Sequence, residues 1–208
     1  IPDDWDAYFS LESYEETFDR AILFAKEHPE TLWCYGNHDV SYPWAKFESG
    51  YSPYAESTVL QKLEELENSL QDRTKIAVVH RVDNVIFCHG GLAEDFISRL
   101  NKNMLKADID AVISAVNNAS QDCLWEDDSP LWLRPQDDYF NMFRTDIYTQ
   151  VVGHTPIEQI YEENGVISTD VFSTYPDGRQ IGESAMIVID TKTREYEKIE
   201  VAGNCKQE

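Results

Sequence analysis

Apolar residues along the chain recur at two different spacings, which predicts both helices and strands. Helical spacing marks segments 11–28, 59–70, 93–101 and 107–119. Short apolar runs bounded by turn residues mark strands at 31–35, 76–79, 85–88, 150–152, 165–169, 185–190 and 195–201. Strands and helices alternate over most of the chain, so we expect an α/β protein.

The organisation of these segments favours one domain over residues 1–208, because the sequence shows no internal repeat and no low-complexity linker. The helices and the irregular stretch between about 93 and 145 are interpreted as a helical insertion. The runs 76–79 and 85–88 flank a tight polar turn at Asp83-Asn84, which predicts a hairpin. Residues 41–55 combine Pro, Gly and aromatic residues, which indicates an ordered loop over the site.

Composition narrows the classes of partner. The formal charge of −22, with only 17 Lys and Arg residues, argues against a nucleic-acid-binding surface. No apolar run is long enough to cross a bilayer and no signal peptide opens the chain, so we expect no membrane partner. The four cysteines have no metal-type spacing, which favours a reducing, cytoplasmic location.

Three short polar motifs each follow a predicted strand. They are Gly36-Asn37-His38-Asp39, His89-Gly90-Gly91 and Gly153-His154-Thr155-Pro156. Motifs at strand ends gather polar side chains at one rim of a sheet, where α/β proteins build their sites. One Asn and two His residues converging at such a rim predict a metal site.

Each motif also has a simpler interpretation. Asn37 is either a neutral oxygen ligand or an ordinary turn residue after glycine. His38 is either a proton-transfer group oriented by Asp39 or one half of a surface His–Asp pair. His89 and His154 are either metal ligands or exposed turn residues. The coincidence of three motifs favours the functional interpretation.

Two arginines are candidates for binding a phosphate. Arg134 lies in the apolar and aromatic segment Leu131-Trp132-Leu133-Arg134-Pro135, and its planar fork suits two substrate oxygens. The alternative is a solvated Arg134 neutralised by nearby acidic residues, which are Asp127, Asp128, Asp137 and Asp138. Arg81 is a second, weaker candidate.

The order and spacing of the three motifs resemble the calcineurin-like metallophosphoesterase superfamily. Phe87-Cys88-His89-Gly90-Gly91-Leu92 and Leu131-Trp132-Leu133-Arg134 are similar to its branch of Ser/Thr protein phosphatases and bacterial diadenosine-tetraphosphatase-like enzymes. The resemblance implies a β-sandwich flanked by helices in α/β/β/α layers. It also implies a hydrolase with two divalent ions of the Mn, Fe or Zn type, whose bridging hydroxide attacks phosphorus.

The same resemblance assigns a role to each candidate residue. Asn37, His89 and His154 would bind the second metal, His38 with Asp39 would serve proton transfer, and Arg134, with Arg81 as the weaker candidate, would hold the phosphoryl group. Phosphoproteins, dinucleoside polyphosphates and small phosphomonoesters all remain open as substrates. The competing interpretation from another class is a non-catalytic scaffold of the same fold that binds proteins.

The chain departs from the family pattern at its N-terminal end. The Asp-x-His and Gly-Asp-x-x-Asp motifs that bind the first metal in the family are absent before Asn37. We therefore expect an N-terminally incomplete domain without its first strands, with at most one well-ligated metal site and little turnover.

Overall fold

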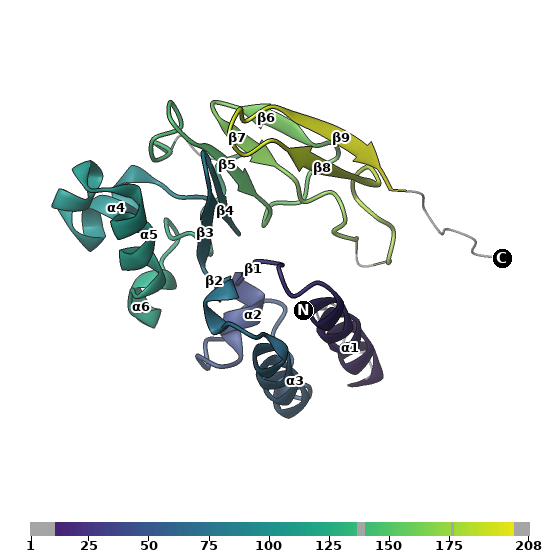
Figure 1. The fold of residues 1–208 in the computed structure, drawn as a ribbon. Helices are drawn as coiled ribbons and strands as arrows, with labels where there is room; N and C mark the ends of the chain where they lie inside the picture. The colour runs from purple at the N-terminus through teal and green to yellow at the C-terminus, as the bar shows by residue number, and fades with distance from the viewer. Residues whose placement is uncertain (1–10, 137–139, 176, 202–208) are drawn as a thin grey trace. The chain divides into compact units, whose positions relative to one another are not determined.

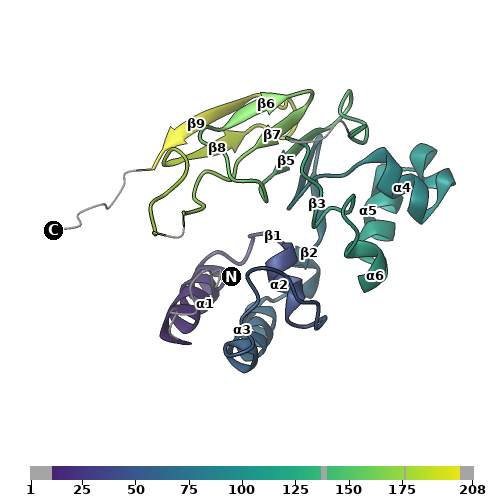
Figure 2. The same cartoon turned by 180° about the vertical axis from the view of Figure 1, so that it is seen from behind.

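Two units make up the chain, Ile1–Ala77 and Val78–Glu208, and each is considered by itself. The structure is a computed structural model, drawn in Figures 1 and 2, and it describes residues 11–136, 140–175 and 177–201.

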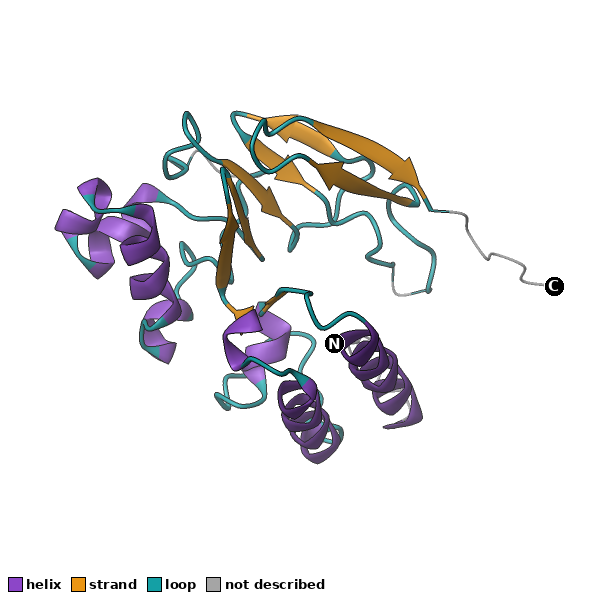
Figure 3. Ribbon diagram, viewed as in Figure 1, coloured by secondary structure: helices purple, strands orange, loops and turns teal. Residues whose placement is uncertain are grey.

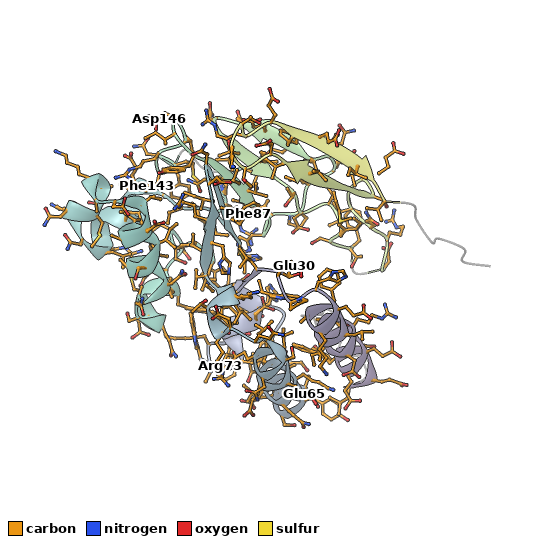
Figure 4. The ribbon with its side chains drawn as sticks, viewed as in Figure 1. Glu30, Glu65, Arg73, Phe87, Phe143 and Asp146 are labelled. Carbon is orange, nitrogen blue, oxygen red and sulfur yellow. The ribbon has the colours of Figure 1, made fainter. Side chains whose placement is uncertain are left out.

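The first unit is built on two helices that pack side by side, α1 (Leu11–Glu27) and α3 (Glu56–Ser69). Their apolar stripes form one core, whose buried members are Tyr14, Phe18, Ile22 and Ala25 from α1 and Val59, Leu63 and Leu66 from α3. Glu65, labelled in Figure 4, is half exposed and its carboxylate pairs with Lys62. The apolar period therefore places the core of this unit correctly.

Shorter elements complete the first unit. Strand β1 (Trp33–Cys34) pairs in parallel with β2 (Ile76–Ala77), and α2 (Asn37–Ser41) follows β1 directly. A 3-10 turn, η1 (Arg73–Lys75), precedes β2. The loop after α2 is ordered by its own aromatic side chains. Tyr42 stacks on Tyr51 with ring centroids 4.4 Å apart, and the Tyr42 hydroxyl accepts a hydrogen bond from the Ser52 amide.

Tyr35 gives the first unit a pH-dependent contact. Its hydroxyl donates to Glu67 Oε1 at 2.7 Å, and burial followed by that hydrogen bond raises the pKa of Tyr35. A raised tyrosine pKa means that folding favours the neutral form, so the contribution is complete below about pH 10 and falls above it. We expect Tyr35→Phe to unfold about 1 kcal/mol more easily at pH 8. The difference in free energy of unfolding between the unaltered chain and Tyr35→Phe should narrow between pH 10 and 11, as measured by urea titration. A difference that stays constant over this range would contradict the raised pKa of Tyr35.

The second unit contains a five-stranded mixed sheet in the order β3-β4-β5-β7-β6. The strands are β3 (Val79–Val82), β4 (Val85–Cys88), β5 (Thr149–Val152), β6 (Tyr161–Glu163) and β7 (Val166–Ser168). Strands β4, β5 and β7 are parallel, and β3 and β6 close the two edges in antiparallel pairs. The carboxyl ends of three neighbouring strands therefore meet at one rim.

Both faces of this sheet are covered, as Figure 3 shows. Helices α4 (Glu94–Leu100), α5 (Ile109–Asn117) and α6 (Gln121–Leu124) lie beside β3 and β4, with the 3-10 segment η2 (Lys102–Lys106) between α4 and α5. A hairpin of β8 (Ala185–Ile189) and β9 (Tyr196–Glu200) packs on β5 and β7 through an apolar cluster that includes Ile167 and Ala185. The Asn117 side chain accepts a hydrogen bond from the Val79 amide and donates one to the Val79 carbonyl. These two bonds give the backbone of the edge strand β3 partners at Val79.

The predicted α/β class is confirmed, and several predicted elements form with shifted bounds. The strand expected over 31–35 has only two residues, and the predicted hairpin uses Val79–Val82 as its first strand because Ile76–Ala77 pairs with β1 instead. Strand β6 was not expected. The four-layer metallophosphoesterase sandwich is not confirmed. In the described part of the chain no helix is both long and apolar enough to span a membrane.

Candidate functional site

Two histidines meet where the neighbouring parallel strands β4 and β5 end. His89 directly follows β4, and His154 lies two residues past β5. The Nδ1 atom of His154 lies 2.9 Å from Nε2 of His89, and the ring centroids are 4.6 Å apart. The Gly153 amide donates to the His89 carbonyl at 2.9 Å, which ties the two strand ends together. The pairing of polar residues at adjacent strand ends, predicted from the motifs, brings these two imidazoles into contact.

His154 is held in a costly backbone conformation. Its φ is +65°, in the left-handed region that a residue with a Cβ adopts only at a cost of about 1–3 kcal/mol. Such strain persists where surrounding structure enforces it, and it concentrates at functional sites. The residue with the strained backbone is therefore the same one whose ring contacts His89.

The segment Pro130–Gln136, called here the site loop, lies directly on Gly90. The Gly90 amide donates to the Pro130 carbonyl at 2.6 Å. A Cβ at position 90 would lie 2.6 Å from the Leu133 carbonyl oxygen and 3.1 Å from that of Pro130, both backbone atoms. Only glycine permits this approach. Leu131 and Leu133 anchor the loop in the core, where both are fully buried.

Arg134 reaches from the site loop to the end of β5. Its Nη1 donates to the His154 carbonyl and to Thr155 Oγ1, each at 3.2 Å. Both hydrogen bonds use Nη1, so Nη2 and Nε make none with the described residues and keep their N–H groups for a ligand. The fork therefore lies beside His154 with three N–H donors that no described residue uses, and a guanidinium with such donors can bind two oxygens of an oxyanion.

A buried glutamine supports the segment after His89. Gln150, fully buried on β5, accepts from the Leu92 amide at 2.7 Å and donates to the carbonyls of Leu92 and Phe143, each at 3.0 Å. Phe143 is labelled in Figure 4. The sequence interpretation missed this residue, although a glutamine inside an apolar strand is itself a signal, because a buried polar group needs partners.

Three other predicted residues, Asn37, His38 and Asp39, lie in the first unit. Asn37 is buried at the start of α2. The Oδ2 atom of Asp39 accepts from the Gly36 amide at 2.8 Å, at the start of the same helix. The Nδ1 atom of His38 lies 3.2 Å from Oε1 of Glu48, a nearly buried carboxylate. Glu48, which the sequence interpretation did not include, thus places a carboxylate beside His38, and the role of His38 with Asp39 stays a prediction.

Arg81 is engaged away from the histidine pair. Its Nε and Nη2 donate to Asp110 on α5 at 3.0 and 2.8 Å, and Nη1 donates to the Asp83 carbonyl. All three guanidinium nitrogens thus have partners, and the role of Arg81 in substrate binding stays a prediction. Of the acidic residues expected around Arg134, Asp137 and Asp138 lie outside the described residues, and Asp128 pairs with Arg99.

The predicted metal centre does not fit the residues that the structure brings together. Across residues 11–136, 140–175 and 177–201, no group of three or more His, Cys, Asp or Glu side chains could hold a metal ion. Among these residues His89 and His154 contact each other, but they belong to no such group of three. The expectation of two divalent ions in the complete protein, with at most one well-ligated site in this chain, is therefore contradicted.

Comparison with known proteins finds solved structures of low similarity to this chain. No family model matches the chain, and no curated protein matches it. A cold-active protein-tyrosine phosphatase of a psychrophilic Shewanella species is 20% identical, with 81% of this chain and 58% of that chain covered and a TM-score of 0.47. A second structure of a cold-active protein tyrosine phosphatase is 18% identical, covering 80% and 56%, with a TM-score of 0.48.

These comparisons contradict the family assignment made from the motifs. The matched structures are named protein tyrosine phosphatases, and none is named a calcineurin-like metallophosphoesterase. The prediction of a metal-dependent phosphoesterase, which rests on that family assignment, is therefore also wrong. The chain spans less than two thirds of the length of the structures it matches. At these identities and TM-scores the likeness assigns no activity to this chain.

Proposed function

We propose that the chain forms part of a phosphatase that hydrolyses phosphate esters at the ends of β4 and β5. The observation that carries the proposal is the position of Arg134, which is fixed by the backbone of His154 while that residue's ring contacts His89. An oxyanion-binding fork thus stands next to an acid–base pair. The names of the matched structures agree with phosphate-ester hydrolysis.

The three side chains have complementary roles in this proposal. Arg134 binds two phosphoryl oxygens through Nη2 and Nε and stabilises the charge that they carry in the transition state. In the contact between His154 Nδ1 and His89 Nε2, one ring donates and the other accepts. The pair can therefore deliver a proton to the leaving oxygen as the ester bond to phosphorus breaks and water adds to phosphorus.

The acidic chain makes the local charge at this site important. With a net charge of −22, the protein repels a phosphate dianion on approach. A guanidinium held at the strand ends offsets this repulsion locally, so we expect the phosphoryl group of the substrate to bind at Arg134. Phosphorylated compounds in general are the proposed substrates.

Arg134→Lys tests the proposal. Lysine keeps the positive charge and loses the fork, so we expect kcat/KM for p-nitrophenyl phosphate to fall roughly tenfold, and inhibition by inorganic phosphate to weaken in parallel. Arg194→Lys is the matched control, because Arg194 Nη1 also donates to two oxygens, the carbonyls of Asp146 and Ile147, at the other end of β5. Equal activities of the two variants, or no hydrolysis by the unaltered chain, would contradict the proposal.

A further inference from the structure

Two buried polar atoms on the site loop lack hydrogen-bond partners among the described residues. They are Nε1 of Trp132 and Oε1 of Gln136. The other end of the Gln136 amide has a partner, since Nε2 donates to Ser168 Oγ at 2.9 Å. The Trp132 ring is held between two others, perpendicular to His154 at 5.9 Å and nearly perpendicular to Trp125 at 5.0 Å.

These two residues flank Arg134 on the side of the strand ends. Leu131 and Leu133 are fully buried in the core, while the alternate residues contact the rim of the sheet. Trp132 and Arg134 both contact His154 or its neighbour, and Gln136 contacts Ser168, which pairs with Val152 across β5 and β7. The loop thus presents an indole, a guanidinium and a carboxamide to one rim.

A buried polar atom without a hydrogen-bond partner lowers the stability of the fold by about 1–3 kcal/mol, so two such atoms on one loop need an explanation. A ligand that supplies the missing hydrogen-bond partners would explain both. An indole nitrogen can only donate, and a carboxamide oxygen can only accept. The ligand must therefore carry an acceptor near Trp132 and a donor near Gln136.

A phosphoryl group on Arg134 provides only the acceptor, because the oxygens of a phosphate dianion have no proton to donate. The donor must therefore come from the leaving group. A hydroxyl or amide N–H close to the ester oxygen meets this requirement, whereas a simple alkyl or aryl leaving group does not.

We propose that Trp132 and Gln136 contact the substrate and select phosphomonoesters whose leaving group carries a hydroxyl or amide N–H beside the ester oxygen; this rests on the proposed phosphatase function. Trp132 donates to a phosphoryl oxygen, and Gln136 accepts from the leaving group. Both atoms are closed to solvent, so on binding the Trp132 indole turns toward the phosphoryl group and the Gln136 carboxamide oxygen turns toward the leaving group.

Two small esters test the selection, 2-hydroxyethyl phosphate and 2-methoxyethyl phosphate, which differ in one hydrogen-bond donor. We expect the unaltered chain to favour the hydroxyl compound by about tenfold in kcat/KM, since sites built around a hydrogen bond reject analogues that lack it. Gln136→Met has a similar shape and no acceptor oxygen, so its ratio should fall to about one. Gln136→Glu keeps an acceptor and should retain a preference.

Trp132→Phe tests the second contact separately. Phenylalanine keeps an aromatic ring against Trp125 and His154 but removes Nε1. We expect inhibition by inorganic phosphate to weaken several-fold, with the preference between the two esters unchanged. Near-ultraviolet circular dichroism of each variant confirms that it is folded.

The outcomes separate this inference from the proposed function. Hydrolysis of both esters at equal rates, or an unchanged ratio in Gln136→Met, overturns the inference and leaves the phosphatase proposal intact. Unchanged phosphate inhibition in Trp132→Phe overturns the role of the indole. If the unaltered chain hydrolyses neither ester nor p-nitrophenyl phosphate, the proposed function fails, and the inference fails with it.

Discussion

Gly90→Ala is expected to lower phosphatase activity about a hundredfold, although the residue has no side chain to take part in chemistry. The added Cβ would lie 2.6 Å from the Leu133 carbonyl oxygen and 3.0 Å from the Leu133 amide nitrogen. Neither atom can turn away as the end of a flexible side chain could. The site loop must therefore shift by roughly 1 Å, and Arg134 shifts with it relative to His154.

The measurement compares kcat/KM for p-nitrophenyl phosphate with the free energy of unfolding in urea. Overpacking at Gly90 should also destabilise the protein, by about 1–3 kcal/mol. The affinity for inorganic phosphate should fall together with kcat/KM, because the displaced fork binds the phosphoryl group in both the ground state and the transition state.

Gly153→Ala is the matched control. Gly153 belongs to the same site, and a Cβ there would meet its nearest neighbour, the His89 carbonyl oxygen, at 3.9 Å, which is ordinary van der Waals contact. We expect activity within about twofold of the unaltered chain, or about 0.4 kcal/mol. Equal losses in the two variants would show that the close approach of the site loop is not what positions Arg134.

The spacing of apolar residues predicts the helices correctly, but it does not predict how the short strands pair. The stripe from Tyr14 to Ala25 forms the buried face of α1, as the spacing predicts. The β6–β7 hairpin was missed although its turn, Asn164-Gly165, has φ values of +51° and +78°. Asn-Gly is the strongest short hairpin signal. The residues of β6, Tyr161–Glu163, are exposed and two of the three are charged. They lack the apolar run that predicts a strand.

Strand position and local sequence single out His89, His154 and Arg134 as candidates, but they do not say what these residues do together. The motifs predict which side chains gather at a sheet rim, and the structure brings these three into contact. Partners distant in sequence could not be read in the same way. Glu48 lies ten residues from His38, and Asp39, the nearer carboxylate, faces the start of its own helix. The predicted metal set failed because a motif specifies a ligand type without specifying how many ligands converge.

His154→Asn is expected to abolish most of the activity while leaving the stability nearly unchanged. The left-handed φ of +65° strains any residue with a Cβ, but asparagine adopts it more readily than most. The free energy of unfolding should therefore change by less than about 1 kcal/mol. Loss of the imidazole removes the acid–base pair with His89, and we expect kcat to fall about 10²- to 10⁴-fold.

Two further variants test whether His154 is both strained in its backbone and required for activity. Glycine at this position should match or exceed the stability of the unaltered chain, since it relieves a backbone cost of about 1–3 kcal/mol, and should be as inactive as asparagine. Asn164→Gly offers the same backbone relief at φ +51° in the β6–β7 turn, away from the site, and should keep full activity. If His154→Gly unfolds more easily than the unaltered chain, the left-handed conformation is not strained. If His154→Asn stays within threefold of normal activity, the imidazole pair is not the acid–base group, and the strain at the strand end serves packing alone.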